Sequence, residues 1–329
     1  MRAVLFTAGL LLLSLAGAAI YAVRSYDVPG PLTVANVVLV PRGGLDQVVE
    51  SLVQEGVVHS AFALRVAALA TRGQGAIHAG ELEFPAAASL RQVLEVLRNA
   101  RPVQHRLTIP EGLTAAQVAV LLDRAPALEG NPAVPEEGRL LPETYAYERG
   151  TPRATLVERG RIAMNRALER NWAARSQAVP LDTPHDALIL ASIVERETAK
   201  PEERPRVAAV FLNRLRHRMK LQSDPTVVYG VSGGTGVLEH GLTKADLERA
   251  DPYNTYRIAG LPPGPISMPG LASLRAVMQP ASTDDLFFVA DGSGGHAFAR
   301  TAEEHQRNVA HWREVERARQ AVASGATGR

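Results

Sequence analysis

The sequence predicts an α+β protein with an N-terminal transmembrane helix, a small α+β unit and a larger mixed α+β domain. Three observations predict this organisation. Residues 4–23 form an uncharged apolar run, the stretch 24–33 combines two prolines with a glycine, and helical and strand-like hydrophobic patterns alternate along the rest of the chain. With 46% hydrophobic and 21% charged residues, the 329-residue chain has the composition of a globular protein.

The apolar run at 4–23, VLFTAGLLLLSLAGAAIYAV, is long enough to cross a bilayer as a helix, which needs about 20 residues. Arg2 and Arg24 flank the run and balance each other, so charge alone does not set its orientation. A cleaved signal peptide is the alternative, because Ala16-Gly17-Ala18 offers small residues for cleavage. The run continues to Val23 without a polar break, which favours a retained anchor. Either interpretation sends the remainder of the chain across a membrane.

The segment 34–103 predicts the small α+β unit. NVVLV and GELEF, at 36–40 and 80–84, are the expected strands. Apolar residues recur at helical spacing after each strand, and Ser89 is a candidate N-cap. The expected helices are 45–56, 59–73 and 89–100.

The larger domain uses the same elements. Residues 106–125 predict a strand, a Pro-Glu-Gly turn and a helix with Thr114 as N-cap, and Thr301 with Glu304 forms a capping box for the last helix. Between them we expect a loop at 126–142, helices at 153–176, 184–199 and 206–219, little regular structure at 220–270 and a hairpin at 285–300.

Several kinds of chemistry are excluded by what the sequence lacks. The chain has no cysteine, and its nine histidines are scattered rather than spaced as zinc ligands. We find no GxSxG elbow, no phosphate-binding Walker motif and no strand-associated GxGxxG. The net charge of +2 does not call for a nucleic acid. The sequence therefore predicts no metal, no cofactor and no nucleic-acid partner.

Two glutamates end the apolar segment ALILASIVERETAK at 187–200. Glu195 and Glu197 lie about 200° apart on a helix, so they do not form a close carboxylate pair. We expect one to bind arginine and the other to face a cleft, the alternative being that both are structural ion-pair partners. A carboxyl in an apolar wall stays protonated near neutral pH and can protonate a leaving oxygen, which suits cleavage of a glycosidic bond.

Two loop segments, LQSDPTVVYG at 221–230 and DPYNTYRIAGLPPGPISMPG at 251–270, are rich in side chains that hydrogen-bond or stack on sugars. Composition alone would equally suit a structural loop. The candidate sugar-binding residues are Gln222, Asp224, Tyr229, Tyr253, Asn254 and Tyr256.

Together with ASIVERET, RPRVAAVFLNRLRHRMK and FFVADGSGGHAF, these segments resemble the YceG-like family of endolytic murein transglycosylases over about residues 185–312. The resemblance implies a single-pass inner-membrane protein whose catalytic domain faces the periplasm. It maps a cytoplasmic tip to 1–3, the transmembrane helix to 4–23, a linker to 24–33, a LysM-like subdomain to 34–103, the catalytic domain to 104–320 and a frayed tail to 321–329. The LysM-like segment matches poorly, and Ser223 stands where some relatives have Thr.

The resemblance also implies which acid is catalytic. The second Glu of the ExET block, Glu197, corresponds to the family's catalytic residue. Implied supporting or substrate-binding residues are Glu195, Thr198, Asn213, Gln222, Asp224, Tyr229, Tyr253, Asn254 and Tyr256.

The implied reaction cleaves the β-1,4 bond between N-acetylmuramic acid and N-acetylglucosamine within glycan strands, leaves 1,6-anhydro ends and ends strand growth without a cofactor. The implied partners are peptidoglycan glycan strands and peptidoglycan synthases of the penicillin-binding class. A glycan-binding scaffold without activity and a muramidase-type hydrolase are the alternatives.

Overall fold

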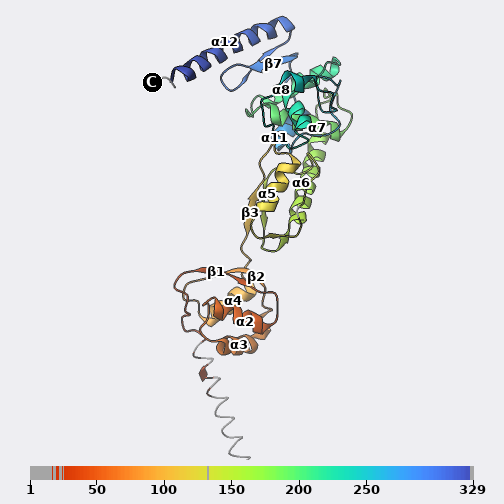
Figure 1. Cartoon of the computed structure of the whole chain (residues 1–329). Helices are drawn as coiled ribbons and strands as arrows, with labels where there is room; N and C mark the ends of the chain where they lie inside the picture. Colours follow the sequence, from red (N-terminus) through yellow and green to blue (C-terminus); the bar gives the residue numbers. More distant parts are fainter. Residues whose placement is uncertain (1–16, 18–19, 22–23, 25, 132, 327–329) are drawn as a thin grey trace, which may run out of the picture. The chain divides into compact units, whose positions relative to one another are not determined.

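The computed structural model describes residues 17, 20–21, 24, 26–131 and 133–326 (Figure 1). The expected transmembrane helix at 4–23 lies almost entirely outside these residues. Within the described part of the chain, no helix is both long enough and apolar enough to cross a membrane. The chain divides into two compact units: residues 1–105 with 127–129 and 146–151, and residues 106–126 with 130–145 and 152–329.

The first unit is built on an antiparallel strand pair, in which Asn36 lies opposite Phe84 and Val40 opposite Gly80. Val38 and Val40 face the core, because successive side chains of a strand point to opposite faces. The capping box at Ser89 confirms the predicted helix start. The elements are β1 (Asn36–Val40), α2 (Leu45–Gln54), α3 (Ala61–Ala70), the 3-10 turn Arg72–Gln74, β2 (Gly80–Phe84) and α4 (Leu90–Asn99).

The second unit is mostly helical, and one strand hairpin lies wholly within it. Strand β3 (His105–Thr108) pairs with β5 (Thr144–Tyr147), and β4 (Leu128–Glu129) pairs with β6 (Thr151–Pro152). Of these strands, residues 105, 128–129, 146–147 and 151 are assigned to the first unit. The predicted hairpin is confirmed as β7 (Phe287–Ala290) and β8 (His296–Ala299). The helices are α5 (Ala115–Arg124), α6 (Arg153–Ala173), α7 (Pro184–Glu197), α8 (Arg204–Arg216), α9 (Asp224–Val231), α10 (Lys244–Glu248), α11 (Leu271–Met278) and α12 (Ala302–Ala326).

Two expectations from the sequence were incomplete. The region 220–270 contains α9 and α10, because Pro at the first turn and a Thr243 capping box start helices that lack a long hydrophobic period. The expected loop at 126–142 begins with the two-residue strand β4, whose pairing with β6 depends on residues that follow it by more than twenty positions.

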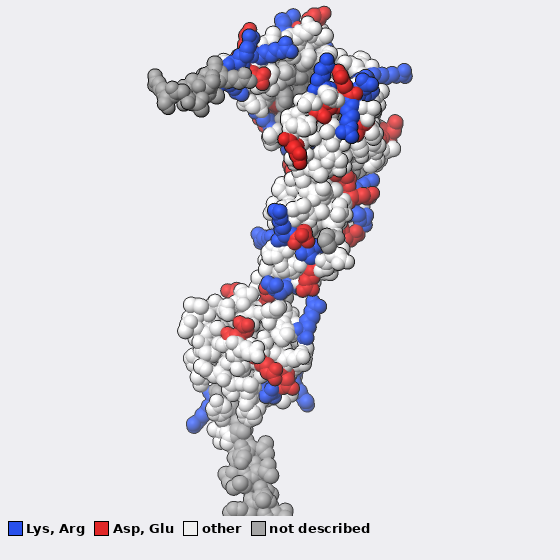
Figure 2. Space-filling view, viewed as in Figure 1, with Lys and Arg blue, Asp and Glu red and all other residues white. Residues whose placement is uncertain are grey.

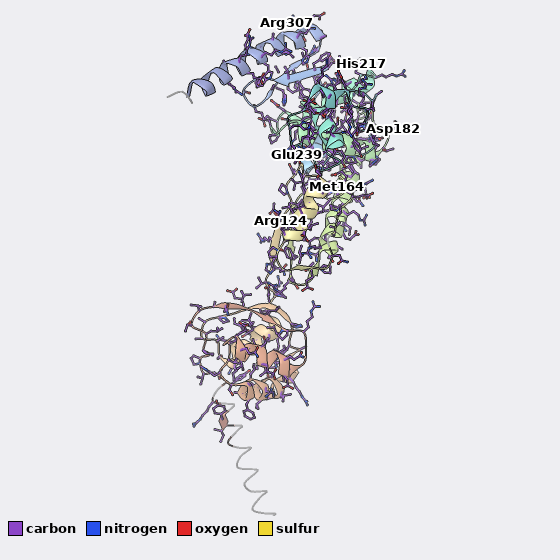
Figure 3. All side chains as sticks on the ribbon, in the orientation of Figure 1. Arg124, Met164, Asp182, His217, Glu239 and Arg307 are labelled. Atoms are coloured by element: carbon purple, nitrogen blue, oxygen red, sulfur yellow. The ribbon has the colours of Figure 1, made fainter. Side chains whose placement is uncertain are left out.

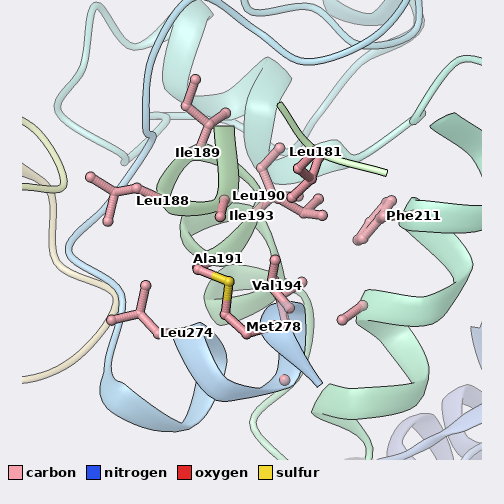
Figure 4. Close-up of a cluster of buried hydrophobic side chains, with 14 of the residues drawn as sticks. Leu181, Leu188, Ile189, Leu190, Ala191, Ile193, Val194, Phe211, Leu274 and Met278 are labelled. Carbon is pink, nitrogen blue, oxygen red and sulfur yellow. The ribbon is translucent and has the colours of Figure 1, made fainter. Parts of the chain in front are cut away.

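Helix α7 lies at the centre of the second unit, and every residue from 187 to 194 is buried. Figure 4 shows its side chains enclosed by Leu274 and Met278 of α11 and by Phe211 of α8. A helix that is apolar on all sides is stable only when neighbours cover all sides. The packing therefore holds α7 rigidly, including its last turn.

Charged side chains of both signs are interspersed on the visible face of the second unit (Figure 2). Asp182, His217 and Glu239 lie on its surface, whereas Met164 of α6 is fully buried (Figure 3). This mixture agrees with the small net charge of +2.

Candidate active site

Glu197 is the last residue of α7, where the apolar helix ends. Thr183 and Asp186 form a capping box at the other end, and Pro184 occupies the first turn, so both ends of the helix are fixed. Glu197 is partly exposed as a residue, and its Oε1 accepts a hydrogen bond from Ser223 Oγ at 2.5 Å. A reactive group here is rigidly held yet accessible.

Burial raises the pKa of the Glu197 carboxyl to about 7. The Ser223 hydrogen bond and the Arg214 guanidinium oppose this change, and the nearby Asp224 carboxylate adds to it. The partial negative charge at the C-terminus of α7 also disfavours a second negative charge at this position. A pKa near neutrality is what a residue needs to donate a proton and then accept one.

Arg214 of α8 is the cation whose charge lowers the pKa of the Glu197 carboxyl, and this arginine is 7% exposed. Its Nε donates to the Leu286 carbonyl at 2.7 Å and its Nη1 to the Leu221 carbonyl at 2.7 Å. Burial lowers the pKa of Arg214, but a guanidinium remains charged. Arg214 therefore both holds the segment before Ser223 and offsets negative charge at the site.

The two predicted sugar-binding segments meet beside Glu197. The Tyr256 hydroxyl donates to Asp224 Oδ1 at 2.6 Å, and the Ser223 amide donates to Thr255 Oγ1 at 2.9 Å. Asp224 is exposed and Tyr256 partly exposed, so both can contact a ligand. The structure brings these two residues together with Glu197.

Glu195 points away from this site. Residues two positions apart on a helix are separated by about 200°, so the side chains of Glu195 and Glu197 lie on nearly opposite sides of α7. Its Oε1 accepts from Arg204 Nη2 at 2.8 Å and its Oε2 from the Gly270 amide at 2.9 Å. The side chain is 4% exposed. Glu195 thus ties α7 to α8 and to the start of α11.

The side chains of three other expected site residues form hydrogen bonds within the protein. Thr198 donates to Glu203 at 3.3 Å and accepts from the Lys200 amide at 3.1 Å. Asn213 donates to the Thr283 and Asp285 carbonyls. The Asn254 side chain is 1% exposed and donates to three carbonyls, those of Asp246, Leu247 and Arg249. These contacts favour architectural roles over sugar binding.

The remaining candidates are accessible. Gln222 is exposed and has φ of +52°, a left-handed conformation that is uncommon for a residue other than glycine. Tyr229 and Tyr253 are partly exposed, their ring centroids lie 4.8 Å apart, and the Tyr229 hydroxyl donates to Glu137 at 3.2 Å. Burial raises the pKa of Glu137.

Sequence reasoning did not select Ser223, Arg214, Thr255 or Glu137. Ser223 lies between the candidates Gln222 and Asp224, and its hydroxyl is the one feature of the sequence that could have pointed to it. Arg214 is one of several arginines on α8, and nothing in the sequence distinguishes it from the others. No group of three or more potential metal-ligating side chains occurs in the described residues.

Comparison with known proteins places these features in a family. The YceG-like family matches residues 38–311. Curated relatives include the endolytic murein transglycosylases of Bacillus subtilis (strain 168), 34% identical over 53% of this chain and 47% of that protein, and of Streptococcus pneumoniae serotype 2 (strain D39), 33% identical over 59% of this chain and 35% of that protein. The chain thus aligns with about half of the first relative's length and about a third of the second's.

The fold is similar to the crystal structure of a YceG-like protein from Listeria monocytogenes. The TM-score is 0.51 and the sequences are 27% identical, over 83% of this chain and 98% of that one. The sequence match extends over both compact units and includes Glu197 and its neighbours. The chain belongs to the YceG-like family.

Proposed function

We propose that this chain is an endolytic lytic transglycosylase that cleaves the β-1,4 bond between N-acetylmuramic acid and N-acetylglucosamine in peptidoglycan. The observation on which the proposal rests is the Glu197 carboxyl, which lies at the end of a well-packed helix, accepts a hydrogen bond from Ser223 and has a pKa raised by burial to about 7. The family membership and the names of the aligned transglycosylases support the same reaction.

In the proposed reaction, neutral Glu197 donates its proton to the bridging glycosidic oxygen. The bond from that oxygen to the muramoyl C1 breaks, and positive charge develops at C1. The C6 hydroxyl of the same sugar then forms a bond to C1 and gives its proton to the Glu197 carboxylate. The carboxyl returns to its starting state, and no water is consumed.

This chemistry explains why one acid is enough. Most glycosidases need a second carboxylate, either to activate water or to act as the nucleophile. An internal hydroxyl replaces both, because a nucleophile held within the same sugar attacks at high effective concentration. Glu195 is unavailable as a second acid, since its two oxygens bind Arg204 and Gly270.

Asp224 has a different role in this proposal. Its carboxylate is exposed, lies close enough to Glu197 to raise the pKa of that group, and is oriented by the Tyr256 hydroxyl. Asp224, Tyr256 and Gln222 position the sugars, and the negative charge of Asp224 favours the positive charge that develops at C1. A hydrolase that uses Asp224 as a base is the competing function.

Product analysis of the wild-type chain and of Glu197→Gln on purified glycan strands tests the proposal. Wild type should release products lighter by one water than the hydrolytic products, and Glu197→Gln should release none while still binding glycan. Products with reducing ends would establish the hydrolase instead. Equal glycan release by both proteins would contradict the role of Glu197, and binding without release by either would favour a scaffold.

We further propose that residues 4–23 anchor the chain in the bacterial inner membrane, with residues 34–103 as a LysM-like subdomain and 104–320 as the catalytic domain in the periplasm. There it would end the elongation of nascent strands beside peptidoglycan synthases. The length and apolar character of 4–23 support the anchor. Protease added to intact spheroplasts should digest the chain beyond residue 33 if this topology is right, and protection of that part would reject it.

A further inference from the structure

The Ser223 hydroxyl has a defined relation to the Glu197 carboxyl. Its Oγ donates to Oε1 at 2.5 Å, within the range of hydrogen bonds between a hydroxyl and a carboxylate. Ser223 is 1% exposed, so water does not compete for this bond. Glu197 Oε2 is left without this partner and is the oxygen available to a substrate.

A buried hydroxyl cluster fixes Ser223 in place. Its amide donates to Thr255 Oγ1 at 2.9 Å, and its carbonyl accepts from Thr226 Oγ1 at 2.7 Å. The two threonine hydroxyls are 2.9 Å apart, and neither residue is exposed. With both backbone groups bound, the serine side chain points at Oε1 without needing the substrate to arrange it.

The backbone of Gln222, the residue before Ser223, shows that surrounding contacts determine the conformation of this turn. Gln222 has a left-handed backbone, which is strained for a residue other than glycine. Its amide donates to the Thr255 carbonyl at 3.2 Å, so Thr255 holds two consecutive residues of this turn. Such strain persists only where surrounding contacts determine the conformation.

A neutral carboxyl has one proton and two oxygens. Because Oε1 accepts the Ser223 hydrogen, the acidic proton is best placed on Oε2. When that proton leaves, negative charge spreads over both oxygens, and the hydrogen bond to Oε1 strengthens because its acceptor is now ionised. The serine therefore affects both states of Glu197: it determines which oxygen carries the proton, and it stabilises the carboxylate after the proton has left.

We propose that Ser223 is a positioning residue for the transglycosylase reaction: it directs the acidic proton of Glu197 to Oε2 and stabilises the carboxylate formed when that proton is donated. The role rests on the proposed function, in which Glu197 first donates and then accepts a proton. It is independent of how the sugars are bound. Ser223 itself does not contact the reacting atoms.

Other charged groups around Glu197 come from three further segments. Arg214 of α8 favours the ionised carboxylate and Asp224 of α9 disfavours it, while the Glu197 charge in turn raises the pKa of Tyr256, in the loop after α10. None of these groups changes in a Ser223 variant. A change in the titration of Glu197 can then be attributed to the lost hydrogen bond.

The test compares Ser223→Ala with Ser223→Thr, which keeps a hydroxyl, in the full-length chain. Carbon-13 NMR of labelled glutamate carboxyls follows the one resonance that disappears in Glu197→Gln. Ser223→Ala should raise the titration midpoint of that resonance by about one pH unit, because a donor to the ionised form is lost. Ser223→Thr should stay near the wild-type midpoint.

Activity gives the second readout. In Ser223→Ala, the fall of kcat at high pH should move to higher pH with the midpoint, and the maximal kcat should fall about tenfold or more. Ser192→Ala is the matched control, since Ser192 is an equally buried serine of α7 whose hydroxyl bonds only backbone groups at Ile189 and Ile266. It should leave midpoint and pH profile unchanged.

An unchanged midpoint in Ser223→Ala would overturn the inference even if the enzyme remained active. An equal shift in Ser192→Ala would do the same, since it would indicate general loosening. If Ser223→Ala shifts the midpoint but the wild-type chain forms no anhydro product, the proposed function fails while the control of the carboxyl by Ser223 is supported.

Discussion

Glu195 and Arg204 form a buried ion pair with the carboxylate oxygen 2.8 Å from the guanidinium nitrogen, and their side chains are 4% and 9% exposed. Glu111 approaches the same guanidinium at 3.4 Å from the exposed side. Two residues along α7, Glu197 has a serine in place of an arginine as its hydrogen-bond partner. The two glutamates of one helical turn therefore have different partners, and we expect their replacement to have different effects.

Replacing Glu195 by Ala should lower the free energy of unfolding by about 3 kcal/mol, because it leaves the buried Arg204 with only the more distant Glu111. Urea unfolding followed by tryptophan fluorescence measures this, since Trp172 and Trp312 both belong to the second unit. Glu158→Ala, which breaks an exposed pair with Arg161, is the control and should have no measurable effect. Equal stability of the two variants would contradict a buried ion pair.

Glu197 should make the fold less stable as the pH rises. Its pKa is about 7 in the folded chain against 4.5 for an unperturbed glutamate, so both states are protonated below pH 4.5. Between these values the unfolded chain loses the proton that the folded chain keeps, and stability falls by on the order of 3 kcal/mol before levelling off.

The variant Glu197→Gln isolates this contribution. Glu111 and Glu137, whose pKa values are also raised chiefly by burial, give slopes of the same sign in both proteins. The difference in unfolding free energy between variant and wild type should therefore grow in favour of Gln from pH 4.5 to 7. A difference that does not change with pH would show that Glu197 titrates normally.

Asp224→Asn should lower the titration midpoint of Glu197 by about half a pH unit, because it removes a like charge that favours the neutral carboxyl. Carbon-13 NMR of the Glu197 carboxyl measures the midpoint. Tyr256→Phe is the comparison: it removes the hydrogen bond to Asp224 but keeps the charge, so it should not lower the midpoint. A decrease in both variants would indicate a change of loop structure rather than of charge.

Much of the local structure could be predicted from sequence, because its causes are local. Ser89 and Thr114 begin helices through side chains that bind amides three residues ahead, so both N-caps form as predicted, and each is completed as a capping box by the glutamine at that position. The apolar residues of α7 likewise predict burial on all sides. Helix α9 was missed because DPTVVYGV has Pro, Gly and β-branched residues and no helical hydrophobic period.

The site could be predicted only in part. Which carboxylate binds arginine depends on Arg204 in space, since several arginines lie near both glutamates in sequence. The Ser223–Thr255 contact joins residues 32 positions apart, and a hydrophobic pattern in the sequence does not reveal contacts between residues so widely separated. Residue type also does not reveal burial: Asn254 and Tyr256 looked alike as sugar-binding candidates, yet one is 1% exposed and the other partly exposed.

The last prediction separates architecture from substrate contact within that group. Asn254→Ala should lower the free energy of unfolding by about 2 kcal/mol, because it removes a buried side chain that donates to three backbone carbonyls. Gln222→Asn should leave the free energy of unfolding nearly unchanged, since Asn tolerates the left-handed backbone at this exposed position.

The shorter side chain of Gln222→Asn should instead raise KM for glycan strands severalfold with kcat retained, because it no longer reaches the sugar. Urea unfolding and steady-state kinetics on both variants make the comparison. A stable Asn254→Ala variant with raised KM, or a Gln222→Asn variant with wild-type KM, would reverse the assignment of that residue.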